Sequence, residues 1–319
     1  MSVPPLNNPA ASAPSAIADA VAGNWVDRHA PAAWRPFLRL SRADRPIGTW
    51  LLYLPCLWAV GLAAGATGWR WFDLWLVIGC AVGAFLMRGA GCTWNDIQDR
   101  HIDGQVSRTA ARPIPAGAVS ARGAAVWMVA QALAAFLILL TFNTTAILWG
   151  IASLLPVAVY PFAKRFTWWP QVFLGIAFNW GALLIWVAHT GSLSWAAVAL
   201  YGAGIAWTLH YDTIYAHQDR EDDALIGVKS TARLFGEATV PWLWSFTAAA
   251  TVLAGLAVAL AGGGALAYGG AAALGAHMAS QTHRLDIHDT ARCLALFRET
   301  RFGGIAFAAL LMLDATLRA

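Results

Sequence analysis

The sequence predicts an all-α membrane protein of nine transmembrane helices with a cytoplasmic N-terminus. Composition, the lengths of the apolar segments and the positions of the basic residues lead to this prediction. Apolar side chains make up 59% of the 319 residues and charged side chains only 12%, too few polar groups to cover a water-soluble globule. The mean hydropathy of +0.55 agrees. A lipid bilayer is therefore the expected environment of most of the chain.

The number of spans follows from the apolar segments. A helix needs roughly 20 apolar residues to cross about 30 Å of hydrocarbon, and nine segments approach that length with few or no charges. The predicted spans are residues 47–66, 72–94, 123–140, 145–163, 170–189, 193–211, 240–261, 264–281 and 302–318.

Basic residues give the orientation, because short cytoplasmic loops retain Lys and Arg. With nine spans, 18 of the 21 basic residues fall on the side of the N-terminus, only Arg70 and Arg318 fall opposite, and Arg88 lies inside a span. If one span had been missed, the basic residues of all later loops would fall on the opposite side, and the asymmetry would be lost. The net charge of +4 thus reflects membrane topology, so we expect no nucleic-acid partner, and no obligate protein partner is evident.

The first 33 residues are rich in Ala and Pro, which predicts a disordered cytoplasmic tail ahead of one intramembrane domain, residues 34–319. They lack the apolar core of a secretory signal and the Arg-rich, acid-poor composition of an organelle transit peptide. We therefore expect a multi-pass protein of a bacterial inner (plasma) membrane, with its active site facing the cytoplasm.

The first acidic cluster follows the second predicted span. Asp96, Asp99 and Asp103 are spaced i, i+3, i+7, which places three carboxylates on one face of a helix, and Asn95 stands one turn before Asp99. Like charges at this spacing destabilise a helix, and burial raises the cost. A cation is expected to compensate them.

The second acidic cluster follows the sixth predicted span. Asp212, Tyr215, Asp219 and Asp223 repeat the helical spacing along one expected stripe. The loops after both clusters contain a basic Thr-Ala segment, a weak sign of internal duplication. A duplication would bring the two clusters together across a pseudo-twofold axis.

These clusters predict a magnesium site. An ordinary acidic run is a solvated surface, but nearly half of the 17 acidic residues fall in these two short segments. Carboxylate and amide oxygens without His or Cys suit a hard cation, and Mg²⁺ commonly takes a few carboxylates, waters and substrate phosphate oxygens. Two acidic faces flanking a diphosphate would let the metal neutralise the leaving group.

Basic residues near the same loops could complete a diphosphate site, although each of them could instead only set the orientation of the protein in the membrane. Arg88 stands out because it lies within an apolar span seven residues before Asn95, and an intramembrane arginine suggests a site. A structural pair with a buried carboxylate is the alternative. The candidates for substrate binding are Arg45, Arg88, Arg108, Arg112, Lys164 and Lys229.

At these residues the chain resembles the intramembrane aromatic prenyltransferases of the UbiA type, and among them the 4-hydroxybenzoate polyprenyltransferases. The resemblance runs from about residue 38 to 302. The first family signature, Asn-Asp-x₂-Asp-x₃-Asp, begins at Asn95, and the second, Tyr-Asp-x₂-Tyr-Ala-x₂-Asp-x₃-Asp, begins at Tyr211. Supporting blocks are Arg45 to Thr49, Arg112 to Pro115, Tyr160 to Arg165, and Pro170 with Gln171.

The resemblance implies nine helices around a central cavity and Mg²⁺-dependent transfer of a polyprenyl group from its diphosphate to the ring carbon ortho to the hydroxyl of 4-hydroxybenzoate, an early step of ubiquinone formation. By position, it assigns metal binding to Asn95, Asp96, Asp99, Asp103, Asp219 and Asp223. It links Asp212 and Arg165 to orientation of the acceptor. Tyr215 is placed to stabilise an allylic cation through its ring, so the catalytic candidates are Asp96, Asp99, Asp212, Tyr215 and Arg165.

Two other interpretations remain open. A relative in the same superfamily could use another acceptor, such as a naphthoate or a porphyrin. An ion-coupled transporter would also carry carboxylates in a helical membrane protein, but transporter sites usually lie near the bilayer midplane on broken helices, whereas these acids begin where the predicted spans end on the cytoplasmic side.

Overall fold

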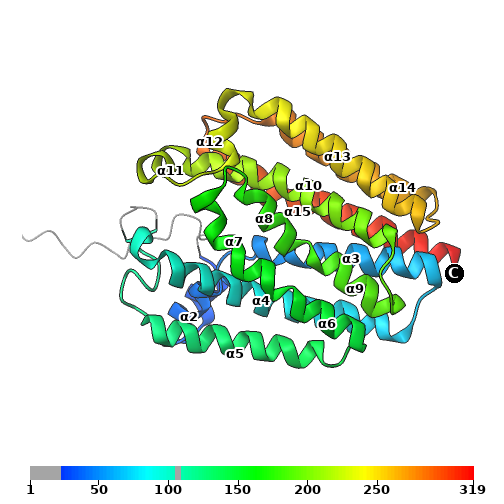
Figure 1. The fold of residues 1–319 in the computed structure, drawn as a ribbon, viewed down its shortest axis with the longest axis horizontal. Helices are drawn as coiled ribbons and strands as arrows, with labels where there is room; N and C mark the ends of the chain where they lie inside the picture. Colours follow the sequence, from blue (N-terminus) through cyan, green and yellow to red (C-terminus); the bar gives the residue numbers. More distant parts are fainter. Residues whose placement is uncertain (1–22, 105–108) are drawn as a thin grey trace, which may run out of the picture.

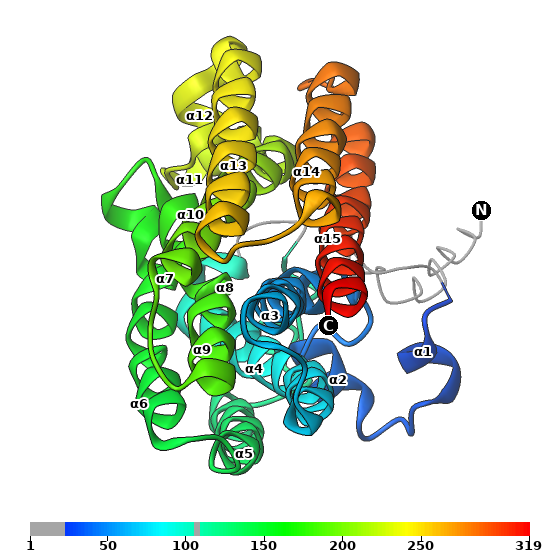
Figure 2. The same ribbon diagram turned by 90° about the vertical axis from the view of Figure 1, so that its right-hand side faces the viewer.

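The computed structural model describes residues 23–104 and 109–319, apart from the side chains of Asp222 and Ile226, and every regular element in these residues is helical. The helices run roughly parallel along the longest axis of the molecule (Figure 1) and are seen end-on in Figure 2. The prediction of an all-α fold is confirmed for the described residues.

The elements follow the predicted segments closely. Two of them are short 3₁₀ turns, η1 (His217–Asp219) and η2 (Gly236–Ala238). The α-helices are α1 (Trp25–His29), α2 (Arg35–Leu40), α3 (Ile47–Thr67), α4 (Trp71–Asp103), α5 (Ala121–Leu139), α6 (Thr144–Ala152), α7 (Leu154–Phe166), α8 (Pro170–Phe178), α9 (Trp180–Thr190), α10 (Trp195–Ala216), α11 (Arg220–Ile226), α12 (Thr231–Phe235), α13 (Thr239–Leu260), α14 (Ala265–Arg284) and α15 (Thr290–Arg318).

Seven helical segments in the described residues are long and apolar enough to cross a membrane, whereas the sequence predicted nine. Each predicted span overlaps a helix, but α10 and α14 do not meet the criterion of length and composition. Polar residues explain the difference: α10 ends in His210, Tyr211, Asp212 and Thr213, and α14 ends in Gln281, Thr282, His283 and Arg284. Two of the seven segments, Thr144–Phe166 and Pro170–Thr190, each consist of two consecutive helices.

The two ends of the bundle differ. At one end, tight turns join α3 to α4, α5 to α6, α9 to α10 and α13 to α14, and the C-terminus lies there (Figure 1). The opposite end carries α2, α11, α12 and the longer connections. The two aspartate clusters, one at the end of α4 and the other from the end of α10 to α11, therefore lie at the same end of the bundle.

The core is built around α3, which packs against α4, α9 and α15 (Figure 2). Trp58 of α3 is fully buried against the rings of Trp207 and Phe307, and its Nε1 donates to the Gly304 carbonyl at 2.8 Å. A Cβ at Gly304 would lie 2.7 Å from Leu54 Cδ1, so glycine lets α15 approach α3 closely. Close packing of this kind fixes the helices that carry the site.

Residues 23–33 of the expected tail are among the described residues, and part of this segment contacts the bundle. Asn24 caps α1 by accepting from Asp27 N at 3.2 Å, and Trp25 Nε1 donates to the Ala43 carbonyl at 2.8 Å. An ion pair of 2.8 Å joins Asp27 to Arg39, and Val26 is fully buried. These contacts hold residues 24–29 against the start of the bundle. Residues 1–22 of the expected tail lie outside the described residues.

A buried polar network joins helices at the end that carries the tight turns. Asp73 is 2% exposed; its Oδ1 lies 2.6 Å from His189 Nδ1, and its Oδ2 accepts from Arg70 N at 2.7 Å. His189 Nε2 contacts Thr67 Oγ1 at 2.8 Å, and the Arg70 side chain donates to the His189 carbonyl. One carboxylate thus ties the α3–α4 turn to the end of α9.

We predict that Asp73→Ala destabilises the fold by about 3 kcal/mol, because it leaves the buried His189 ring without its acceptor. Thermal unfolding of the purified protein in detergent would show this as a lowered Tm. Asp286→Ala, which removes an exposed loop carboxylate, is the matched control and is expected to leave the Tm unchanged. Equal Tm values for the two variants would contradict the structural role of Asp73.

Candidate active site

The first aspartate cluster lies on one continuous helix, α4, as its spacing predicted. With 33 residues, α4 is roughly 50 Å long, so its last turns extend past about 30 Å of hydrocarbon. Asp96 and Asp99 are fully buried and Asp103 is 6% exposed. Three carboxylates buried on one face require positive partners, and cations from three other segments supply them.

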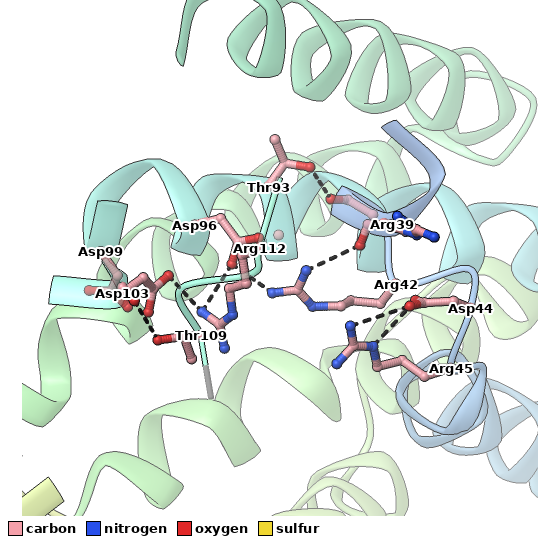
Figure 3. Close-up of polar contacts among 12 residues, drawn as sticks. Arg39, Arg42, Asp44, Arg45, Thr93, Asp96, Asp99, Asp103, Thr109 and Arg112 are labelled. Carbon is pink, nitrogen blue, oxygen red and sulfur yellow. Dashed lines mark hydrogen bonds and ion pairs between the residues drawn. The ribbon is translucent and has the colours of Figure 1, made fainter. Parts of the chain in front are cut away.

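Asp96 is held between two arginines (Figure 3). Its Oδ1 accepts from Arg42 Nη2 at 2.6 Å and from Arg112 Nη1 at 3.3 Å. The same Arg112 nitrogen donates to Asp103 Oδ2 at 2.7 Å, and the Thr109 hydroxyl donates to the Asp103 carbonyl at 2.8 Å. The loop after α4 is therefore folded back onto the helix by its own arginine.

Arg42 reaches Asp96 from the turn between α2 and α3. Its φ of 56° is the only positive φ of a non-glycine residue in the described chain, and that conformation costs an L-residue about 1–2 kcal/mol. The side chain is 8% exposed, and its Nη1 donates to the Arg39 carbonyl at 3.1 Å. The buried ion pair with Asp96 stabilises this turn.

Asp99 pairs with the end of α7. Lys164 Nζ contacts Asp99 Oδ2, and Arg165 Nη2 lies 3.3 Å from Asp99 Oδ1. The Arg165 guanidinium also lies over the Phe162 ring, 5.2 Å from its centroid. These pairs attach α7 to α4 at the height of the cluster.

The second cluster does not form the single helical stripe that its spacing predicted. Asp212 and Tyr215 lie on α10, Asp219 ends the 3₁₀ turn η1, and Asp223 lies on α11. The buried His217 anchors the break, since its Nε2 contacts Thr239 Oγ1 at 3.0 Å. Burial, together with the charge of nearby Arg220, lowers the pKa of His217 to about 4, so the ring is neutral near pH 7.

Members of both clusters nevertheless line one pocket of about 290 Å³. Asn95 and Asp103 come from α4, and Asp212, Tyr215, Asp219 and Asp223 come from α10, η1 and α11. Arg112, Lys164 and Lys229 add positive charge to the same wall. The pocket thus combines carboxylates from two segments with three cations, a composition suited to an anion bound together with a divalent metal.

A second, larger cavity of about 550 Å³ is apolar and lies between α3, α4, α5, α6–α7 and α8–α9. Tyr160 lines both this cavity and the aspartate pocket. Arg88 is the one charged side chain among the residues that line the cavity; its guanidinium lies over the Phe178 ring, 5.3 Å from the centroid, and its Nε is buried without a hydrogen-bond partner. An apolar chain with a charged head could occupy the two spaces together.

The other predicted site residues lie outside the lining of the aspartate pocket. Asp96 and Asp99 are buried behind it in their ion pairs, and Arg165 is 45% exposed beside Asp99. Arg45 forms a pair with Asp44, with Nε 3.3 Å from Oδ1. Arg108 lies outside the described residues.

The structure adds residues that the sequence did not predict as part of the site. Tyr160, Gln171 and Ser230 line the aspartate pocket, and the Gln171 Oε1 accepts from Thr231 N at 3.2 Å. In the sequence, these residues could have been identified as polar residues near the ends of predicted spans, on the same side of the membrane as the two clusters. Arg42 gave no such signal, because its pairing with Asp96 crosses 54 positions of sequence.

The chain is similar to known proteins over most of its length. A family model described as the UbiA prenyltransferase family matches residues 52–311. The mitochondrial 4-hydroxybenzoate polyprenyltransferase of Rattus norvegicus is 49% identical over 282 residues, which cover 88% of this chain and 75% of the relative. The Homo sapiens enzyme of the same name is 47% identical over 278 residues (86% and 74%), and that of Arabidopsis thaliana is 43% identical over 291 residues (91% and 71%).

Solved structures share the fold. The apo structure of a UbiA homolog from Aeropyrum pernix K1 superposes with a TM-score of 0.70 at 25% identity, covering 83% of this chain and 97% of that one. A UbiA homolog from Archaeoglobus fulgidus, bound to DMAPP and Mg²⁺, superposes with a TM-score of 0.62 at 20% identity, covering 84% of this chain and 98% of that one.

The relatives correct the expected location. The sequence was interpreted as that of a bacterial inner-membrane protein, but the curated relatives of Rattus norvegicus, Homo sapiens and Arabidopsis thaliana are mitochondrial enzymes. That assignment is therefore wrong by this comparison. It rested on the composition of the first 33 residues, which carries little information about the membrane in which the remaining helices reside.

Proposed function

Since the chain belongs to the UbiA prenyltransferase family, we propose that it transfers a polyprenyl group from polyprenyl diphosphate to the ring carbon ortho to the hydroxyl of 4-hydroxybenzoate. The observation that carries the proposal is the single pocket lined by both aspartate clusters, which adjoins an apolar cavity through Tyr160. The names of the curated relatives support the acceptor and, through it, a step of ubiquinone formation.

The donor set of the pocket fits Mg²⁺. Asn95, Asp103, Asp219 and Asp223 offer carboxylate and amide oxygens from two sides. Within the described chain, no three His, Cys, Asp or Glu residues are close enough to hold a metal by themselves, which suits a cation that completes its shell with water and substrate phosphate oxygens. When bound, Mg²⁺ would neutralise charge on the diphosphate leaving group. Solved relatives contain Mg²⁺ with DMAPP or GPP.

The cations on the pocket wall complete the diphosphate site. Arg112, Lys164 and Lys229 face the same space as the carboxylates. Lys164 and Arg112 are also paired with Asp99 and Asp103, so they are already oriented before the substrate binds. Positive charges held in place stabilise the charge that develops on the diphosphate as the allylic C–O bond breaks.

The apolar cavity suits the prenyl chain, and Arg88 suits the carboxylate of the acceptor. Arg88 is a charged group in an apolar wall, and its guanidinium lies over the Phe178 ring. An acceptor anchored by Arg88 would present its ring toward Asp212 and Tyr215. The ring attacks the allylic carbon, the C–O bond to the diphosphate breaks, and Asp212 or the released diphosphate takes the ring proton. Tyr160 and Tyr215 would shield the cation from water.

We also propose nine spans with a cytoplasmic N-terminus. The seven apolar segments leave α10 and α14 as the additional spans. Several of their polar residues are buried within the bundle: His210 is fully buried with Nε2 2.9 Å from Thr282 Oγ1, and Gln281 is fully buried. Helices that bury polar groups against protein can cross a bilayer, and the distribution of Lys and Arg supports the orientation.

The reaction itself can be tested directly. Membranes containing the protein are incubated with labelled 4-hydroxybenzoate and prenyl diphosphates of graded length, and mass spectrometry identifies the product. We expect a ring-prenylated 4-hydroxybenzoate. A naphthoate acceptor is the comparison: a product from naphthoate but none from 4-hydroxybenzoate would assign the chain to a relative with another acceptor.

We predict that Asp103→Asn and Asp219→Asn each lower the rate of prenyl transfer on the order of 100-fold, because each removes a charge from the pocket that orients the metal and diphosphate. Asp286→Asn removes a carboxylate from an exposed loop and is expected to leave the rate unchanged. Initial rates are compared at equal amounts of folded protein. Wild-type rates in the pocket variants would contradict the assignment.

Removal of divalent metal should stop the reaction. EDTA is expected to abolish prenyl transfer, and added Mg²⁺ is expected to restore it, because bound Mg²⁺ would neutralise the charge that develops on the diphosphate leaving group. The product is measured before chelation, after chelation and after readdition. Activity that is indifferent to EDTA would count against a metal-dependent site.

We predict that Arg88→Leu raises the KM for 4-hydroxybenzoate roughly 10- to 100-fold while changing the KM for the prenyl diphosphate little, because it removes a charge-assisted hydrogen bond to the acceptor carboxylate. Gly48→Ala tests the position of the same group without removing its charge, since a Cβ at Gly48 would lie 2.3 Å from Arg88 Nε. It is expected to raise the same KM. A selective rise in the KM for the diphosphate would assign Arg88 to the other substrate.

A further inference from the structure

We infer that Arg42 is a positioning residue for the diphosphate: its buried ion pair with Asp96 holds the Arg112 guanidinium in place at the aspartate pocket. The inference rests on the proposed function and deepens it. Arg42 does not line the pocket, whereas Arg112 does. Its effect is therefore transmitted through Asp96, the carboxylate that both arginines contact.

The first argument is the backbone of Arg42. A φ of 56° places it in the left-handed region, where glycine is common and arginine is rare. The turn between α2 and α3 directs the Arg42 side chain into the bundle, where Nη2 donates to Asp96 Oδ1 at 2.6 Å. This ion pair offsets the cost of the backbone conformation. The Nη1 atom is fixed in turn by the Arg39 carbonyl at 3.1 Å.

The second argument is the distribution of charge. Asp96 is fully buried, and both arginines reach the same oxygen, Oδ1, Arg42 more closely than Arg112 (Figure 3). Its other oxygen, Oδ2, is buried without a hydrogen-bond partner. Arg42 thus neutralises most of the Asp96 charge, which leaves Arg112 free to donate at 2.7 Å to Asp103, a residue of the pocket wall.

The consequence of removing Arg42 follows from these contacts. An uncompensated buried carboxylate draws the nearest cation, and for Asp96 that cation is Arg112, 3.3 Å away. Arg112 would turn from Asp103 toward Asp96 and away from the substrate. Asp103 would lose this contact, and the Arg112 guanidinium would leave the pocket wall, so the main change is expected in diphosphate binding.

The test is steady-state kinetics of the purified full-length protein with farnesyl diphosphate and 4-hydroxybenzoate, together with inhibition by inorganic pyrophosphate in the presence of Mg²⁺. We expect Arg42→Gln to raise the KM for farnesyl diphosphate and the Ki for pyrophosphate on the order of tenfold. The kcat and the KM for 4-hydroxybenzoate should stay within about twofold, since no contact to the acceptor is removed. A defect of folding alone would lower the apparent kcat and leave both constants unchanged.

Arg39→Gln is the matched control. It removes the same charge three residues earlier, from an ion pair with Asp27 in which both side chains are more than a third exposed, and it should change neither constant. Arg42→Lys, which keeps the charge but loses the forked geometry, should give intermediate values. The inference is overturned if Arg42→Gln has wild-type constants or if Arg39→Gln shifts them equally.

A double-mutant cycle tests whether the effect passes through Arg112. If Arg42 acts by holding Arg112, then Arg42→Gln should add little to the defect of Arg112→Gln; if the two effects multiply, Arg42 acts independently and the inference fails. Should Arg42→Gln fold poorly, Arg42→Lys carries the test, because it keeps the buried charge and loses only the forked geometry. A wild-type Ki for pyrophosphate in that variant would overturn the inference.

The wild-type protein separates this inference from the proposed function. A wild-type enzyme that neither prenylates 4-hydroxybenzoate nor is protected from thermal unfolding by pyrophosphate with Mg²⁺ would refute the proposed function. A wild-type enzyme that does both, beside an Arg42→Gln variant with the same Ki, would refute the role of Arg42 alone.

Discussion

The structure depends on the compensation of negative charge buried at the end of α4. Asp96, Asp99 and Asp103 lie on one face of one helix with almost no exposure, and such a face is stable only when cations reach it. Arg42 arrives from the α2–α3 turn, Arg112 from the loop after α4, and Lys164 and Arg165 from the end of α7. One electrostatic requirement therefore fixes three otherwise separate segments, and two of them, the loop after α4 and the end of α7, contribute residues to the pocket wall.

The sequence predicted what depends on local periodicity. The spacing of Asp96, Asp99 and Asp103 gave their common face correctly, and the apolar segments gave the all-helical fold. The sequence failed where tertiary contacts override periodicity: the expected stripe from Asp212 to Asp223 is broken at η1, where His217 is anchored by Thr239. Similarly, Trp25 and Asp27 contact Ala43 and Arg39 in later segments, and the local composition does not indicate such contacts.

The sequence also could not distinguish a carboxylate that lines the pocket from carboxylates that form buried ion pairs beside it. Periodicity assigns one face to Asp96, Asp99 and Asp103 alike, but only Asp103 of the three lines the pocket. The distinction depends on which cations pack beside each residue, and Arg42 reaches Asp96 across 54 residues of sequence. In the structure this motif therefore places one carboxylate on the pocket wall and two in ion pairs beside it.

The placement of the polar pocket next to an apolar cavity follows from the chemistry of an amphiphilic substrate. A diphosphate requires cations and a metal near water, whereas a polyprenyl chain is stabilised by about 0.8 kcal/mol for each CH₂ group removed from water. Tyr160 lies at the boundary between the two environments, because it lines both the aspartate pocket and the apolar cavity. The same boundary places Arg88 within electrostatic reach of Asp212 from the apolar side. An acceptor acid held there would lie at the junction of chain and diphosphate, which is where the allylic bond breaks.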